Sequence, residues 1–301
     1  MNPIIFILCC ISAGMILRKV DILGKYVPSY LNKLIIYFFI PLLSLLHVSA
    51  INLKLSLIWL TVTPFLVFGL SVLSFHLFAA VMNLGQESKA VLILTGGISS
   101  TSFVGFPIFE MCYGEEGLAY GIMLSMGGTI LVFNTLGIGT LFYFAQEKNS
   151  IWGLLRKIIY FLPFIAFVCA LLLNLLDVQL PSIILTSLKT LTSPFSIIAL
   201  LTIGMNIEIR DISQYKKELS IGLIFKLLIA PLGIYLLMWH LFDIQSLIAK
   251  ICIMGAAIGS MNAMSIMTAE KGLKPQLAML MPAISIPLSI PLLLLIHKIL
   301  G

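Results

Sequence analysis

Charge is scarce in this sequence. Asp, Glu, Lys and Arg make up 10% of its 301 residues, whereas soluble domains carry about 25%. No polar block is long enough to form a soluble domain, and apolar runs of about 20 residues, the length that crosses a hydrocarbon core, recur from end to end. The composition, with a mean hydropathy of +1.13, therefore predicts an all-α polytopic membrane protein.

Acidic residues are missing from the interior of every apolar run. This argues against a carboxylate proton relay and against an intramembrane enzyme that needs paired carboxylates. The chain also lacks the Gly-x-Gly-Asp and His-Glu-x-x-His motifs and a phosphate-binding loop that ends in Lys-Ser/Thr. We therefore expect neither an enzyme nor a primary pump, and no cofactor.

Cysteine pairs and histidine clusters are missing as well. The five cysteines have no Cys-x-x-Cys spacing, which leaves free thiols as the expected state and no metal site. The net charge of +6 comes from basic residues in short loops beside apolar runs, so we expect the lipid bilayer as a partner and no nucleic acid.

Ten apolar segments are predicted to span the membrane as helices. They are residues 3–17, 30–49, 55–81, 89–112, 117–144, 153–174, 181–205, 219–241, 247–270 and 275–298. A short cytoplasmic connector, 146–156, separates a first five-helix repeat, 1–145, from a second, 157–301. Because five is odd, the two repeats must have inverted topology.

Lys and Arg are concentrated in the loops on one side of these segments. The positive-inside rule assigns that side to the cytoplasm. The distribution therefore predicts a multi-pass protein of the cell (inner) membrane, with the N- and C-termini on the extracellular or periplasmic side.

Residues 94–107, LTGGISSTSFVGFP, interrupt the fourth segment with glycine, hydroxyl side chains and proline. Glycine lowers helix propensity, and proline removes an amide donor. In a bilayer such unwinding is tolerated only where it is buried or lines a cavity. The stretch predicts a broken helix that holds a ligand; a kinked helix packed through small residues is the alternative.

The second half of the chain echoes the first. GGISSTS at 96–102 is matched by AAIGSMN at 256–262 in the ninth segment, and Pro41 in the second segment is matched by Pro194 in the seventh. We expect helix bends at both prolines. Two opposed half-helix N-termini would expose unpaired N–H groups and form an anion site, although unwound carbonyls could hold a cation instead.

The candidate substrate-binding residues lie in these two interruptions. They are Ser99, Ser100, Thr101, Ser102, Gly105, Pro107, Ser260, Asn262 and Ser265. The hydroxyl groups can donate to a carboxylate or bond neighbouring carbonyls. The Asn262 amide needs polar partners in hydrocarbon, and a helix–helix hydrogen bond is its alternative role.

Lys226 is a charged residue well inside a predicted span. Intramembrane charges are functional hypotheses by default, whereas a lysine can also snorkel to the membrane surface. If it is functional, Lys226 is a charge partner of the anion or takes the place of a coupling cation.

Four motifs carry a family resemblance: FVGFP at 103–107, YG at 113–114, SPFSIIALLTIG at 193–204 and FKLLIAP at 225–231. With them the sequence resembles bacterial members of the auxin efflux carrier family along its whole length. The resemblance implies ten helices in two inverted repeats, with broken helices four and nine crossing beside a substrate cavity, and a fold similar to that of bile-acid/sodium symporters. The sequence departs from the family in having Ser100 where asparagine is usual, and from its plant members in having no proline in the ninth segment.

These observations predict a secondary transporter of small organic anions (carboxylates) that works by alternating access. A carrier of neutral or hydrophobic solutes is the alternative within transport. An intramembrane enzyme and a structural or sensory membrane protein are the alternatives from other classes. Coupling to H+ or Na+ and a homodimeric state are left open by the sequence.

Overall fold

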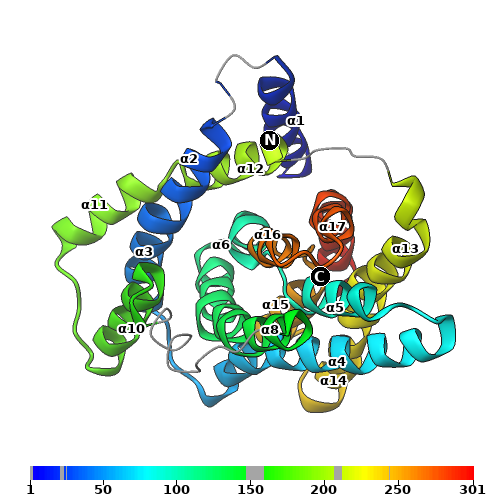
Figure 1. Cartoon of the computed structure of the whole chain (residues 1–301). Coiled ribbons are helices and arrows are strands. Elements are labelled where there is room, and N and C mark those ends of the chain that lie inside the picture. The colour runs from blue at the N-terminus through cyan, green and yellow to red at the C-terminus, as the bar shows by residue number, and fades with distance from the viewer. Residues whose placement is uncertain (1–2, 21–23, 25, 147–158, 207–211, 244) are drawn as a thin grey trace.

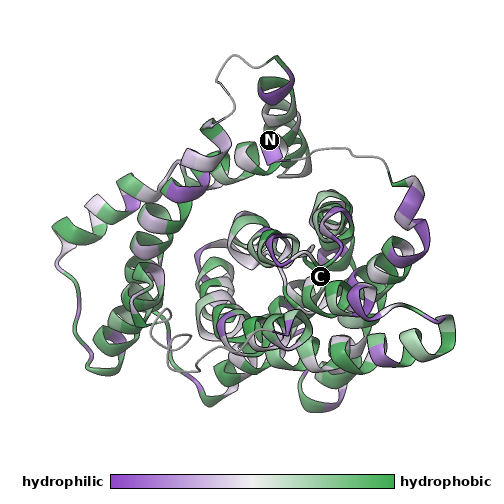
Figure 2. Cartoon of the chain, viewed as in Figure 1, coloured by the Kyte–Doolittle hydropathy of each residue, from purple (hydrophilic) through white to green (hydrophobic). Residues whose placement is uncertain are grey.

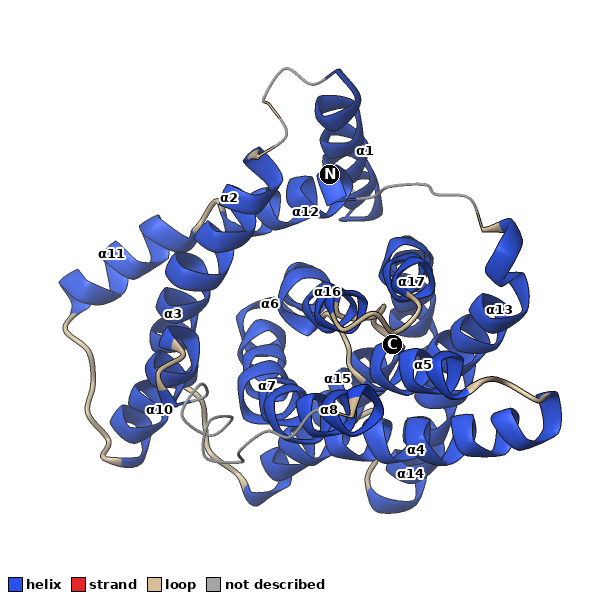
Figure 3. Ribbon diagram, viewed as in Figure 1, coloured by secondary structure: helices blue, strands red, loops and turns tan. Residues whose placement is uncertain are grey.

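The computed structural model describes residues 3–20, 24, 26–146, 159–206, 212–243 and 245–301. Within these ranges every regular element is a helix, and the only strand-like feature is an isolated antiparallel bridge between Ser99 and Ser260 (Figure 3). Most of the helical ribbon is formed by apolar residues (Figure 2). The prediction of an all-α membrane protein is confirmed at this level.

The helices form two parts (Figure 1). The first part, which we call the panel, comprises α1 (Pro3–Val20), α2 (Val27–Leu34), η1 (Ile35–Phe39), α3 (Ile40–Leu43), η2 (Ser44–Val48), α10 (Leu162–Leu175), α11 (Ser182–Thr192) and α12 (Phe195–Asn206). The panel therefore combines the beginning of the chain with residues from just after its middle.

The second part, the core bundle, contains the remaining helices. They are η3 (Leu55–Leu57), α4 (Ile58–Met82), α5 (Gln86–Gly97), η4 (Thr101–Gly105), α6 (Phe106–Ile122), η5 (Met123–Thr129), α7 (Ile130–Val132), η6 (Phe133–Gly137), α8 (Ile138–Ala145), η7 (Ser213–Tyr215), α13 (Lys216–Ile224), η8 (Phe225–Ile229), α14 (Ala230–Leu241), α15 (Leu247–Ala257), α16 (Asn262–Glu270) and α17 (Pro275–Leu300). Most of the buried apolar side chains belong to this bundle.

Six helical stretches of the described chain are long and apolar enough to cross a membrane. They are Val27–Val48, Leu55–Met82, Thr101–Ala145, Ser182–Asn206, Ser213–Leu241 and Pro275–Leu300. The 45-residue stretch contains Gly114, whose φ of 67° is non-helical. This residue falls between the segments predicted at 89–112 and 117–144. The predicted connector lies almost entirely outside the described residues.

Helix α1 extends beyond the predicted segment at its C-terminal end. The predicted segment stops at residue 17, but the helix continues to Val20 and places Arg18 and Lys19 in its last turn. Basic residues suit this position because a helix C-terminus carries a partial negative charge. Arg18 is therefore part of a helix rather than of the following loop.

Three prolines follow π-helical segments. Pro41, Pro107 and Pro231 each lie two residues after the end of such a segment, namely η1, η4 and η8. Proline cannot donate to the carbonyl four residues earlier, and its ring clashes with that carbonyl. A π-turn is one known way to accommodate this disruption without ending the helix. At Pro194, by contrast, α11 ends at Thr192 and α12 begins at Phe195.

Glycines bring α1 and α12 into close contact within the panel. A Cβ atom at Gly14 would lie 2.2 Å from the carbonyl oxygen of Leu201, and one at Gly204 would lie 2.1 Å from that of Ile11. Small residues at such crossings are typical of membrane helices. In the same panel α10 packs against α3 and η2, and Asn174 of α10 donates hydrogen bonds to the carbonyls of Val48, Ser49 and Ile51.

Candidate functional site

The two predicted helix interruptions meet in the core bundle. The chain leaves helix between α5 and η4 at residues 98–100, and between α15 and α16 at residues 258–261. The Ser100 amide donates to the Gly259 carbonyl at 2.8 Å, and the Met261 amide donates to the Ile98 carbonyl at 3.0 Å. These two bonds pair the interruptions in antiparallel fashion around Ser99 and Ser260. We call residues 98–100 and 258–261 the paired breaks.

Each break is followed by a new helix start. Helix resumes at Thr101 after the first break and at Asn262 after the second, and neither N-cap residue, Ser100 or Met261, caps it with a side chain. The first N–H groups of a helix have no partner within the helix. Both starts therefore present amide donors and the positive end of a helix dipole beside the breaks.

Lys226 is fully buried and reaches the first break from η8. Its Nζ donates to the Gly96 carbonyl at 3.1 Å and to Ser99 Oγ at 2.8 Å. Gly96 lies in the last turn of α5, where carbonyl groups lack helical partners. Lys226 therefore caps the half-helix from inside the protein, and the side chain does not snorkel to the surface.

Hydroxyl groups around the breaks form a polar layer. Ser99 Oγ donates to the Gly255 carbonyl at 3.1 Å. Thr101 pairs with Thr129, and Ser102 pairs with Ser125 on η5 at 2.7 Å.

Ser260 lies opposite Ser99 in this layer. Its amide donates to Ser285 Oγ of α17 at 2.9 Å. Its own Oγ is buried, and no residue in the described part of the chain bonds it. An unsatisfied buried hydroxyl is energetically unfavourable, so this group is a candidate for a bond to a solute or water.

Two sizeable cavities adjoin the breaks. The larger one, of about 370 Å³, lies between the panel and the core bundle. It is lined by Arg18, Pro28, Ser29, Asn32, Ser100, Phe103, Val104, Ile203, Met205, Asn206, Asn262, Ile266, Met279, Pro282, Ala283 and Ile286. The smaller one, of about 80 Å³, is lined by residues 99–103, 125–126, 129–130 and 261–263 with Ile36, Ile40 and Phe161. Ser100, Phe103 and Asn262 line both cavities.

The other predicted site residues have structural positions. Gly105 allows close packing, since a Cβ there would lie 2.8 Å from Ile258 Cδ1 of the other break. Pro107 is buried at the start of α6. Ser265 bonds the Met261 carbonyl within α16. None of these three lines either cavity, and neither do Pro41 and Pro194.

No cluster of three or more His, Cys, Asp or Glu residues that could hold a metal ion occurs within the described ranges. The groups gathered at the site are backbone amides, hydroxyls, an asparagine and a buried lysine. Such a set is suited to binding a solute by hydrogen bonds, and an excess of donors favours an anion.

Comparison with known proteins identifies the family of the chain. A family model described as membrane transport protein matches residues 1–151, which include the first break and the helices before it. The chain belongs to this family. The match supports the resemblance to auxin efflux carriers at the level of the family. The bacterial assignment and the similarity to bile-acid/sodium symporters stay predictions.

Two relatives of this membrane transport protein are archaeal. An uncharacterized transporter of Methanocaldococcus jannaschii is 25% identical over 238 residues, covering 77% of this chain and 76% of the relative. An uncharacterized transporter of Methanothermobacter thermautotrophicus is 26% identical over 237 residues, with the same two coverages. The family and both relatives are transporters, and transporters are generally not enzymes.

Sequence reasoning missed several cavity residues of this transport protein. Arg18 directly follows the first predicted segment and, like Asn32 and Asn206, was not proposed as a site residue, yet all three line the larger cavity. Asn206 Nδ2 contacts Asn32 Oδ1 at 3.5 Å and thereby joins α12 to α2. The available signal was weak: each residue is a polar side chain close to the end of an apolar run.

Proposed function

We propose that this protein is a secondary transporter of small organic anions, with carboxylates as the substrate class, that works by alternating access. One observation carries the proposal: two interrupted helices pair through their backbones at Ser99 and Ser260, beside cavities that reach both new helix starts. Discontinuous helices of this kind hold substrates in many secondary transporters.

The donor groups decide the charge of the proposed substrate. The amides at the starts of η4 and α16 point their positive dipole ends toward the breaks, and Ser100 and Asn262 add side-chain donors on the cavity wall. No Asp or Glu is among the described residues that line either cavity. A carboxylate would therefore meet donors without a repelling charge.

Lys226 is the proposed charge partner. In its protonated form it would add a positive charge behind the first break, where it already bonds Gly96 and Ser99. This position, on the carbonyl end of a half-helix, is where a bound cation would otherwise be stabilised. Coupling to H+ or to Na+ is a further part of the proposal that uptake measurements must decide.

The whole-chain architecture that we propose is ten membrane helices in two inverted repeats, 1–145 and 157–301, with the broken helices crossing. Reciprocal packing supports it, because α1 of the first repeat contacts α12 of the second while α10 of the second contacts α3 of the first. Positive φ angles at Gly114 and Gly272 support it as well, since each follows one of the broken helices. The hydroxyl pairs Ser125/Thr129 and Ser285/Ser289 also recur with the same spacing.

Alternating access would then be a movement of the panel against the core bundle. The larger cavity opens where α1 ends and α2 begins, which we call the α1–α2 side. Beyond the breaks, α6 is tied to the panel: Lys189 of α11 pairs with Glu115 at 3.1 Å, and Ser196 of α12 bonds Glu110. This arrangement supports a state that is open on the α1–α2 side. In the proposed location, the inner membrane, that side is the predicted cytoplasmic face.

Uptake by purified protein in liposomes tests the proposal. The panel of solutes comprises lactate, pyruvate, succinate and citrate, each with its neutral amide, measured with and without sodium and at two pH values. Saturable uptake of at least one acid, lost in a Ser100→Leu, Asn262→Leu double variant, is expected. Transport of the amides alone would replace the anion proposal with a carrier of neutral solutes, and no transport of any solute would contradict both.

Size-exclusion chromatography of the same samples decides whether the protein is a homodimer.

A further inference from the structure

The mouth of the larger cavity carries a second group of polar side chains, apart from the paired breaks. Arg18 in the last turn of α1, Asn32 on α2 and Asn206 at the end of α12 line it together. All three belong to the panel, whereas Ser100 and Asn262 belong to the core bundle. The cavity thus has polar groups from both parts of the molecule.

Helix α17 measures the distance between these two groups. Four of its residues, Met279, Pro282, Ala283 and Ile286, line the cavity, and the seven-residue step from the first to the last of them corresponds to about 10 Å of α-helix. Ile286 lies at the depth of the breaks, because a Cβ atom at Gly259 would be 2.6 Å from its backbone. The cavity wall formed by α17 therefore extends about two helical turns from the breaks.

The mouth group has the chemistry of a carboxylate site. A guanidinium presents five N–H donors in a planar fork that matches a carboxylate in a bidentate manner. Arg18 is partly buried and also takes part in an interaction within the chain. The contact between Asn206 and Asn32 places two amide side chains on the same wall. Between mouth and breaks the wall is largely apolar, with Phe103, Ile203 and Pro282 among its residues.

We propose that Arg18, assisted by Asn32 and Asn206, forms a carboxylate-recognition site at the cavity mouth and selects anionic over neutral solutes before they reach the paired breaks. This inference rests on the proposed anion transport but concerns a different location and a different part of the molecule.

Lys19 supplies a matched control. It is the neighbouring basic residue, it is exposed, and it does not line the cavity. In liposome uptake with the acids and amides named above, Arg18→Gln should raise the KM of the acids about tenfold or more, with little change in kcat and little change for the amides. Arg18→Lys should be intermediate, because lysine keeps the charge without the planar fork. Lys19→Gln should behave as wild type.

A second variant keeps the test independent of losses in folding. Asn206→Asp adds a carboxylate at the mouth. It should weaken uptake of the acids and leave uptake of the neutral amides unchanged. If wild type takes up acids and Arg18→Gln retains the same preference for acid over amide, the mouth site is wrong while the proposed function stands. If wild type takes up no acid, both proposals fail.

Anionic lipid headgroups share the chemistry of this ligand, and two liposome compositions separate the sources. In purely zwitterionic lipid the effect of Arg18→Gln on KM should persist. An effect that occurs only with anionic lipid would show that Arg18 anchors α1 at the membrane surface, and would overturn the assignment of a solute site.

Discussion

Lys226 shows how much a single side chain contributes to the paired breaks. It is fully buried, and its Nζ bonds two groups of the first break, the Gly96 carbonyl and Ser99 Oγ. Ser99 in turn donates to Gly255 on the other broken helix. One lysine on η8 therefore connects three separate helices at the centre of the core bundle.

We expect Lys226→Met to lower uptake of the transported acid about tenfold or more. Removing one partner of a buried hydrogen bond costs about 1–3 kcal/mol, and a change of about 1.4 kcal/mol corresponds to a factor of ten. Lys217→Met is the control, since Lys217 lies one helix earlier, is exposed, and bonds the Met82 carbonyl. Equal uptake by wild type and Lys226→Met, with equal amounts of folded protein, would show that Lys226 has no part in transport.

At the same scale, Gly14 and Gly204 test the contact between α1 and α12. Alanine at either position places a Cβ atom within 2.2 Å of a backbone oxygen, so the helices must separate. Overpacking of this kind costs about 1–3 kcal/mol. We expect thermal unfolding of Gly204→Ala at a lower temperature than wild type.

Gly69→Ala is the control for this measurement. Gly69 lies within α4, and a Cβ atom there would have no neighbour within 4 Å. Alanine in a helix interior is favoured over glycine by about 0.5–1 kcal/mol. An unchanged melting temperature in Gly204→Ala would contradict the described packing of the panel.

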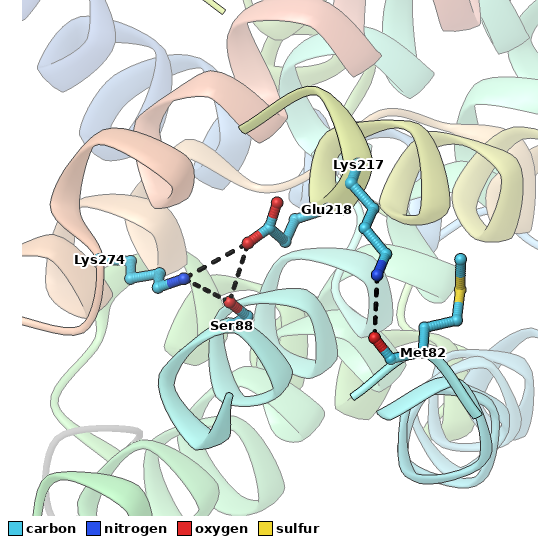
Figure 4. A network of polar contacts seen from close by, with 5 residues as sticks. All are labelled: Met82, Ser88, Lys217, Glu218 and Lys274. Atoms are coloured by element: carbon cyan, nitrogen blue, oxygen red, sulfur yellow. Dashed lines mark hydrogen bonds and ion pairs between the residues drawn. The ribbon is translucent and has the colours of Figure 1, made fainter. Parts of the chain in front are cut away.

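At the scale of helices, a polar network joins the starts of three elements of the core bundle (Figure 4). Lys274, which precedes α17, donates to Ser88 of α5 at 2.6 Å and pairs with Glu218 of α13 at 3.3 Å. Ser88 also donates to Glu218 at 3.3 Å. The three residues hold α5, α13 and α17 together on the α1–α2 side, close to the helices that carry the site.

A double-mutant cycle measures this network. The side chains of Lys274 and Glu218 are 28% and 17% exposed, whereas those of Lys189 and Glu115 are 57% and 68% exposed. We expect a coupling energy of about 0.5–3 kcal/mol between Lys274→Met and Glu218→Gln, as for contacting residues in a network. The exposed pair should give about 0–1 kcal/mol. A larger coupling for Lys189 and Glu115 would contradict the conclusion that Lys274 and Glu218 are the more strongly interacting pair.

The sequence predicted elements better than it predicted contacts. Glycine, hydroxyl residues and proline between Gly96 and Pro107 identified the first break because each weakens helical bonding, and the echo at 256–262 identified the second. The backbone pairing of the two breaks depends on residues more than 150 positions apart, and local propensity contains no information about it. Lys226 was singled out by its charge, but the sequence could not show whether its side chain points to the breaks or to the membrane surface.

The residues that were missed illustrate the same limit. Arg18, Asn32 and Asn206 meet only because α1, α2 and α12 pack side by side in the panel. In the sequence each is a polar residue near a helix end, which is a common feature of membrane helices. Predicted segments such as 55–81, 181–205 and 275–298 lie within a few residues of helical stretches of the structure, whereas the composition of the cavity required the tertiary structure.

At the scale of the whole molecule, the proposed mechanism requires the panel and the core bundle to move relative to each other. Phe103 on η4 and Ile203 on α12 face the same cavity from the two parts. In a cysteine-free background, a reducible cross-link between cysteines at these positions should abolish uptake, and reduction should restore it. A cross-link between Ile266 and Met279, both in the core bundle and both lining the cavity, should leave uptake largely intact. Full uptake with the first cross-link in place would exclude movement of the panel.

The most direct test of the central claim is equilibrium binding of a transported acid to purified wild-type protein and to Asn262→Leu. Asn134→Leu is the control, since Asn134 bonds the Ile130 carbonyl on its own helix and lines neither cavity. If the paired breaks hold the substrate, Asn262→Leu loses about tenfold or more in affinity, as expected for a lost hydrogen bond to a charged group, and Asn134→Leu binds as wild type does. Equal affinity in all three proteins would contradict the account.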